Sequence, residues 1–263
     1  MLKQYDFAFS SKGIENVHSE LAVKIHGMLM HNVPDADAKR MHQNKYHPYS
    51  LYCVPAMDGR KIITRISSIH ESSDIFVEKA AKLDAVNIKG MGIVKITEKG
   101  EIFESELSYL ADRIKGRRFR LQFITPSVFK VKGNEFGFPD ISMHFISVIR
   151  RMNEFEGENI NFDDFRKALY KCRIDSWQFN SHKYNISGTH IPGMTGYTDI
   201  LLPEDEDQMM LKKVFIYASF SGTGGRTAMG MGGFFFSGTI GNTEQRLYNT
   251  EKHKEDSEWQ KYL

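Results

Sequence analysis

The order in which apolar spacing changes along the first half of the chain constrains the fold most strongly. Residues 2–10, LKQYDFAFS, alternate as a strand does, whereas residues 15–33 place apolar side chains at helical spacing along one stripe. Turn residues then separate two further extended runs before a second helical segment and a last extended run. These later segments are residues 49–54, 61–68, 71–83 and 86–96. The order strand, helix, strand, strand, helix, strand is typical of the ferredoxin-like fold.

The second half repeats this order less clearly. After the charged segment ADRIKGRR, the alternating run FRLQFIT predicts a fresh first strand, and FFFSGT predicts a last one. Between them the pattern predicts helices over residues 139–152 and 204–217 and extended segments over residues 172–187 and 195–202. We therefore predict an α+β protein with two ferredoxin-like modules in tandem, residues 1–115 and 116–247. Residues 248–263 form a charged tail.

Composition excludes several other classes of protein. Apolar residues make up 41% and charged residues 26%, which is ordinary for a globular chain. Cys53 and Cys172 stand far apart without CxxC or Cys/His spacing, so we expect no disulfide framework, no bound metal and no cofactor. The N-terminus lacks the apolar core of a signal peptide, and no run is long enough to span a bilayer. We expect a cytoplasmic protein with no membrane partner.

A glycine-rich segment, SFSGTGGRTAMGMGGFFF, covers residues 219–236 and surrounds a single charged residue, Arg226. It fits neither of two familiar phosphate loops. No lysine follows its glycines as in a Walker A loop, and Thr227 occupies the place of the third glycine of a dinucleotide fingerprint. Two interpretations remain: a tight connection between packed elements, or a loop whose backbone N–H groups contact an anion.

A basic stripe runs from Arg113 to Lys132, with seven basic residues and no acidic one, although the net charge of the chain is only +2. In FRLQFIT, period-2 alternation sends three apolar side chains to one face and leaves Arg118, Arg120 and Gln122 on the other. Lys130 and Lys132, in the hairpin VFKVKGNEF, extend the stripe. This face is either an ordinary solvated surface or one that follows nucleic-acid phosphates.

Four segments together resemble a known family. SGTGGRTAMGMG resembles the C-terminal glycine-rich motif of the CRISPR-associated endoribonucleases of the RAMP superfamily, which cut repeat RNA into guides. The segments LAVKIHGMLMHNVPDADAKRMHQNKYHPYSLY, RLQFITPSVFKVKGNEFGFPD and IPGMTG are similar to other parts of that family, in the same order. The similarity spans nearly the whole chain and is greatest to the type III-associated branch.

The resemblance implies a fold of two tandem ferredoxin-like (RRM-like) modules and a metal-independent reaction. In that reaction a 2′-hydroxyl attacks the adjacent phosphate, leaving a 2′,3′-cyclic phosphate and a free 5′-hydroxyl. The implied partner is CRISPR repeat RNA, with transient contact to an effector complex and a homodimer left open. Two alternatives also remain open: a non-catalytic RNA-binding RAMP subunit of an effector complex, and an unrelated ferredoxin-like protein that binds single-stranded RNA.

This chemistry needs a general base, a general acid and a fixed cation near the phosphate. The resemblance places His42 on the catalytic histidine of the family, Lys45 on a catalytic lysine and His31 where some relatives carry a catalytic tyrosine. His26 and His31 lie on opposite flanks of the first helix, so one of the two is expected to be structural. The expected RNA-binding residues are Gly222, Gly224, Gly225, Arg226, Thr227, Gly230, Arg118, Arg120, Lys130 and Lys132.

Overall fold

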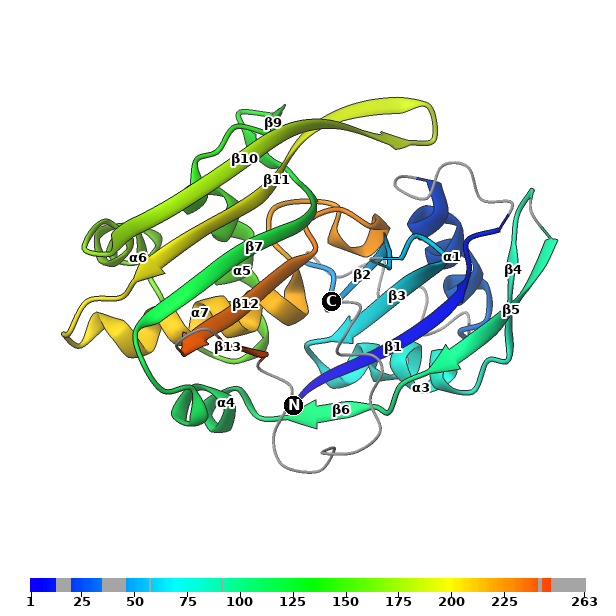
Figure 1. Cartoon of the computed structure of the whole chain (residues 1–263), viewed down its shortest axis with the longest axis horizontal. Coiled ribbons are helices and arrows are strands. Elements are labelled where there is room, and N and C mark those ends of the chain that lie inside the picture. Colours follow the sequence, from blue (N-terminus) through cyan, green and yellow to red (C-terminus); the bar gives the residue numbers. More distant parts are fainter. Residues whose placement is uncertain (13–19, 35–45, 57, 91, 241–242, 247–263) are drawn as a thin grey trace.

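The structure of the protein is a computed structural model, and it describes residues 1–12, 20–34, 46–56, 58–90, 92–240 and 243–246. Two antiparallel sheets lie side by side, each with its own helices (Figure 1). No helix within these residues is long and apolar enough to cross a membrane.

The first sheet has the strand order β2-β3-β1-β5-β4, with β6 paired to the same central strand, β1. Helices α1 and α3 cover one face of it. The elements are β1 (Leu2–Ser10), α1 (Glu20–His31), β2 (Tyr49–Pro55), β3 (Lys61–Ser68), the short 3₁₀ helix η1 (Glu71–Ser73), α3 (Asp74–Ala81), β4 (Ala85–Ile88), β5 (Gly92–Lys99) and β6 (Phe103–Ser105). The predicted ferredoxin-like arrangement is therefore confirmed, with β5 as its fourth strand.

The second sheet has the order β10-β11-β7-β12-β13, which repeats the first arrangement with one strand added at the edge. Its elements are α4 (Leu107–Arg113), β7 (Arg118–Ser127), β8 (Phe129–Val131), β9 (Asn134–Phe136), α5 (Ile141–Phe155), α6 (Phe162–Tyr170), β10 (Arg173–Ile186), β11 (Thr189–Leu201), α7 (Asp207–Ser221), the 3₁₀ helix η2 (Thr227–Met229), β12 (Phe234–Ile240) and β13 (Thr243–Arg246). The glycine-rich segment joins α7 to β12.

Each module has its own apolar core. Leu21, Ile25 and Leu29 of α1 pack on the first sheet, as their helical spacing predicts. In β7 the predicted alternation is also observed, since Phe119, Leu121 and Phe123 are buried in the second core. Helix α4 contributes to that second core although it precedes residue 116, and the module boundary at residue 115 stays a prediction.

Part of the remaining face of each sheet contacts the other module. Tyr52, Val54 and Ile63 of the first sheet are buried together, and Ile124 of β7 packs against them. Ser50 Oγ of β2 donates to the carbonyl oxygen of Phe220, at the end of α7, at 2.5 Å. These contacts fix the two modules against each other.

Several elements differ from the sequence-based expectation, among them β6, α4 and β13, which the pattern does not predict. Residues 86–96 do not form one strand but the hairpin β4–β5, because Gly90 and Gly92 adopt positive φ angles and turn the chain. Helix α6 was not predicted. Strand β11 begins earlier than expected and pairs with β10 in a long hairpin, whose turn uses Ser187 and Gly188, both at positive φ.

Candidate functional site

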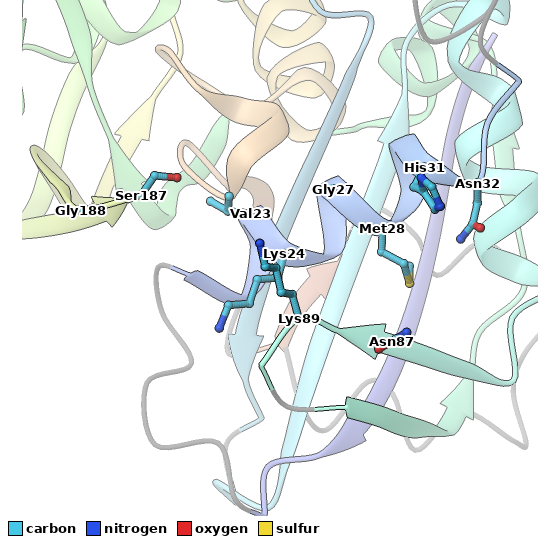
Figure 2. A pocket seen from close by; sticks show the side chains of 10 residues that line it. All are labelled: Val23, Lys24, Gly27, Met28, His31, Asn32, Asn87, Lys89, Ser187 and Gly188. Atoms are coloured by element: carbon cyan, nitrogen blue, oxygen red, sulfur yellow. The ribbon is translucent and has the colours of Figure 1, made fainter.

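A cavity of about 810 Å³ lies beside the exposed face of α1 (Figure 2). Helix α1 supplies one wall, the end of β4 a second, and the tip of the β10–β11 hairpin a third, so both modules contribute to it. The lining residues are Val23, Lys24, Gly27, Met28, His31, Asn32, Asn87, Lys89, Ser187 and Gly188. The volume falls within the range of small-molecule and substrate sites.

The cavity combines one imidazole with two lysines. His31 lies in the last turn of α1 and is exposed, and Lys24 comes from the same helix. Lys89 comes from the turn between β4 and β5, and Figure 2 shows its side chain close to that of Lys24. An imidazole accepts or donates a proton near neutral pH, and an ammonium group stabilises negative charge. The arrangement therefore suits a phosphate-bearing ligand.

His26 has different surroundings from His31. Its Nδ1 lies 3.1 Å from the hydroxyl of Tyr49, and the two rings stack with centroids 5.9 Å apart. Burial raises the pKa of Tyr49 above its usual value, so its hydroxyl stays protonated. His26 does not line the cavity, and its contacts are those of a structural histidine.

Two of the three expected catalytic residues, His42 and Lys45, lie outside the described residues. The segment that contains them begins directly after Pro34, three residues beyond His31, which lines the cavity. The structure therefore places His31, and the roles of all three residues stay predictions.

The glycine-rich segment packs tightly rather than standing open. The amides of Gly222, Gly224 and Gly225 donate to the carbonyl oxygens of Ala218, His144 and Val128, at 2.9, 2.8 and 2.7 Å. A Cβ atom at Gly224, where φ is +68°, would lie 2.2 Å from the oxygen of Val128. Close packing and positive φ angles thus require glycine at Gly222 and Gly224, and all three amides are used inside the protein.

Buried polar side chains hold the segment from beneath. Ser127 Oγ lies 2.8 Å from His144 Nδ1 and 3.0 Å from Thr223 Oγ1. Burial lowers the pKa of His144 to about 4, outweighing its bond to the carbonyl of Phe138. His144 is therefore neutral at physiological pH. Arg151 donates to the carbonyl oxygens of Ser221, Gly222 and Gly224.

The rest of the glycine-rich segment has three kinds of surroundings: an ion pair with Glu135, the protein interior and helix α1. Arg226 adopts a left-handed conformation and bonds Glu135, 2.7 Å from its Nη2. Thr227 is buried. At Gly230, where φ is +96°, an added Cβ would lie 2.4 Å from Cβ of Ala22 on α1. The segment thus contacts the first module, and its role in binding RNA stays a prediction.

The basic stripe is largely paired with carboxylates. Arg118 donates a hydrogen bond to Asp175, and Arg120 forms a bidentate ion pair with Asp199, with hydrogen bonds of 2.7 and 2.9 Å. The bond from Arg120 is the main reason why the pKa of Asp199 lies below its usual value. Lys130 lies 3.4 Å from Glu135, and Lys132 is exposed in the β8–β9 turn. Their role in RNA binding likewise stays a prediction.

Sequence reasoning did not identify Lys24, Lys89 or the hairpin tip as parts of a site. The dipeptide Ser187–Gly188 is a turn signal that could have revealed the hairpin. The two lysines carry no local signal, since exposed lysines are common and only the fold brings these two together. Within the described residues, no group of three or more His, Cys, Asp or Glu side chains is placed to hold a metal ion.

The arrangement of two ferredoxin-like modules in tandem resembles that of solved Cas6 and RAMP structures. Similar solved structures include a Cas6 product complex (TM-score 0.70, 18% identity, 90% of this chain and 100% of that chain) and Thermus thermophilus Cas6 (TM-score 0.63, 17% identity, 90% and 98%). A further solved structure is described as an RAMP protein binding different RNA substrates (TM-score 0.58, 15% identity, 89% and 98%).

The sequence comparisons agree with this fold. Residues 121–234 match the family described as CRISPR-associated endoribonuclease Cas6. The Cas6 of Streptococcus thermophilus is 23% identical over 242 residues, covering 86% of this chain and 95% of that protein. The Cas6 of Mycobacterium tuberculosis is 24% identical over 221 residues, covering 81% of this chain and 70% of that protein. The chain is thus similar in sequence to Cas6 endoribonucleases over most of its length, and its fold is similar to that of solved Cas6 and RAMP structures.

Proposed function

We propose that the protein is an endoribonuclease that cleaves precursor CRISPR RNA within its repeats, without a metal ion. The similarity to Cas6 endoribonucleases supports the class of reaction. The observation that carries the proposal is the cavity on α1, which is lined by His31, Lys24 and Lys89. In this reaction the 2′-hydroxyl attacks the adjacent phosphorus while the bond to the 5′-oxygen breaks.

The proton transfers define what the side chains have to do. A base removes the proton of the 2′-hydroxyl, and an acid protonates the leaving 5′-oxygen. We assign these two steps to His31 and His42. The products are a 2′,3′-cyclic phosphate and a 5′-hydroxyl.

The phosphorane between substrate and product carries more negative charge than the phosphodiester does. We assign its stabilisation to Lys45, with Lys24 and Lys89 binding the flanking phosphates. The contact of Gly230 with α1 supports a glycine-rich segment that positions RNA beside the cavity. Arg226 would be its charged contact with the RNA.

The test is cleavage of repeat RNA in EDTA, with a normal substrate and with one carrying 2′-deoxyribose at the cut site. We expect cleavage of the normal substrate in EDTA and none of the deoxy substrate. His31→Ala and His42→Ala should each slow cleavage by about 10²- to 10⁴-fold. If the two imidazoles act as a unit, the double variant should be little slower than either single variant.

His182→Ala is the matched control, because His182 is an exposed imidazole on β10 that does not line the cavity. It should cleave at the normal rate. A requirement for divalent metal, or cleavage of the deoxy substrate, would contradict the mechanism. Unaltered cleavage by His31→Ala would remove His31 from the site. Tight binding of repeat RNA with no cleavage by the unmodified protein would favour the alternative, a non-catalytic RNA-binding subunit.

A further inference from the structure

A second cavity, of about 580 Å³, lies between the end of α4 and the first turns of α7. Its lining includes three cationic side chains and one carboxylate. The cations are Lys115 and Arg117, from the segment that joins the modules, and Lys212 of α7, and the carboxylate belongs to Asp112. Two of these cations belong to the basic stripe, so the stripe divides between this cavity and the outer face of β7.

Neutral carbonyl oxygens hold two of the three cations. Lys212 Nζ donates to the carbonyl oxygen of Ile114 at 3.1 Å, and Lys115 Nζ donates to that of Asp112 at 2.8 Å. An ammonium group has three donors, so each of these bonds leaves donors for a ligand. Arg117 differs, because it bonds the carboxylate of Glu204 as well as the carbonyl oxygen of Leu202.

The position of Lys212 makes an anion favourable. The residue is only 6% exposed, and its ammonium lies 5.9 Å from the ring centroid of Phe119. Burial lowers the pKa of Lys212, and the positive charge of Lys115 lowers it further. Two like charges close to each other cost free energy, and an anion between them would offset that cost.

This cavity is distant from the site on α1. The carbonyl oxygen of Arg117 accepts a hydrogen bond from the amide of Leu202, beside the Arg173 end of β10, whereas Ser187 at the other end of β10 lines the first cavity. Strand β10 has 14 residues. At about 3.3 Å per residue, the two cavities lie roughly 45 Å apart along the sheet. Figure 1 shows α4 beside the end of the sheet where β11 ends, and α1 beyond the opposite end.

We propose that the cavity between α4 and α7 binds a phosphate group, and that this phosphate belongs to the backbone of an RNA strand outside the cleavage site. The choice of RNA as the source rests on the proposed function. The phosphate chemistry itself rests on Lys115, Arg117 and Lys212. The exposed guanidinium of Arg118, next to the cavity in sequence, would continue the track toward the face of the second sheet.

The experiment compares two charge reversals in the same module. Lys115→Glu alters an exposed side chain of the cavity, and Lys167→Glu alters an exposed lysine of α6 that does not line it. Affinity is measured for a full-length repeat RNA and for a single-stranded RNA too short to reach both cavities, each over a series of salt concentrations. Thermal unfolding confirms that both variants fold.

For the full-length repeat, Lys115→Glu should weaken binding several-fold. The slope of log K against log salt should become shallower by about 0.7 for each phosphate that the variant no longer binds. Lys167→Glu should change neither quantity as much, and both variants should bind the short RNA with the affinity of the unmodified protein. Equal effects of the two substitutions on the full-length repeat would overturn the proposal, because they would show a general charge effect.

A second arm separates RNA from free phosphate as the source. Inorganic phosphate is titrated calorimetrically into the unmodified protein and into Lys115→Glu. Phosphate binding that requires Lys115, together with unchanged affinity for the full-length repeat, would overturn the RNA assignment in favour of a free phosphate compound. Both arms measure binding, so they give an answer even if the protein does not cleave RNA.

Discussion

Arg226 forms an ion pair with a carboxylate. Its Nε and Nη2 both donate to Oε1 of Glu135, at 3.1 and 2.7 Å. Burial alone would raise the pKa of Glu135, but the bonds and charges of Arg226 and Lys130 outweigh it, and the pKa lies below its usual value. Glu135 is therefore ionised at neutral pH, and it offsets the charge that Arg226 would present to an RNA phosphate.

Removing Arg226 and removing Glu135 should thus shift the affinity for RNA in opposite directions. Arg226→Ala should weaken binding of repeat RNA, and Glu135→Gln should strengthen it and steepen the salt dependence by roughly 0.7 in slope. Filter binding across a salt series measures both. Glu158→Gln is the control, because Glu158 pairs with Lys213 of the same module at 2.9 Å. Normal RNA binding by Arg226→Ala would remove Arg226 from the RNA interface.

Helix α7 ends at Ser221, within the glycine-rich segment, and Arg151 of α5 holds this junction. The last carbonyl groups of a helix lack partners within it. Arg151 donates to the carbonyl oxygens of Ser221, Gly222 and Gly224, and it is 6% exposed. Burial lowers its pKa to about 10, which still leaves it charged at neutral pH. One buried guanidinium therefore fixes both the end of α7 and the course of the following loop.

Arg151→Met should destabilise the protein by about 3 kcal/mol or more, because several buried carbonyl groups would lose their donor. Urea unfolding measures the loss. Arg150→Met alters the neighbouring exposed arginine of α5 and should cost less than about 0.5 kcal/mol. Similar midpoints for the two variants would show that Arg151 does not hold the junction.

The sequence predicts elements well where one face is buried and poorly where this pattern is lost. The alternation in β7 and the stripe of α1 each reflect one buried face, so both were predicted correctly. Helix α7 is buried on nearly all sides from Leu211 to Ser221, so no single apolar stripe marks it in the sequence.

The candidate site was less accessible to sequence reasoning than the fold. The sequence places Arg118 and Arg120 on one face of their strand. Their partners Asp175 and Asp199, however, belong to strands that lie far away in the sequence. The glycine-rich segment was recognised as exceptional. The close backbone approach at Gly224 was not visible in the sequence, because it depends on β7 passing beneath the segment. Residues that meet only in the folded chain leave no local pattern.

At the scale of the whole molecule, the cavity on α1 depends on how the two modules are held together. The tip of the β10–β11 hairpin forms one of its walls, and Tyr184 of β10 donates a hydrogen bond to the carbonyl oxygen of Met229 at 3.0 Å. Gly230 then lies between Tyr184 of the second module and Ala22 of the first. A site assembled this way requires the contact at Gly230 to be close.

Gly230→Ala should therefore disturb the site as well as the stability. An added Cβ would lie 2.1 Å from the hydroxyl oxygen of Tyr184 and 2.4 Å from Cβ of Ala22, at a φ of +96°. Gly157→Ala is the matched control, because φ there is +68° and nothing lies within 4 Å of the added Cβ. The control should lose about 1 kcal/mol from backbone strain alone. Gly230→Ala should lose about 1 to 3 kcal/mol more from the clash, measured by urea unfolding.

Because the clash pushes α1 and the hairpin apart, RNA cleavage by Gly230→Ala should fall under conditions where the protein is fully folded, whereas Gly157→Ala should cleave normally. Equal stability and equal cleavage in the two variants would show that the modules do not meet closely at Gly230.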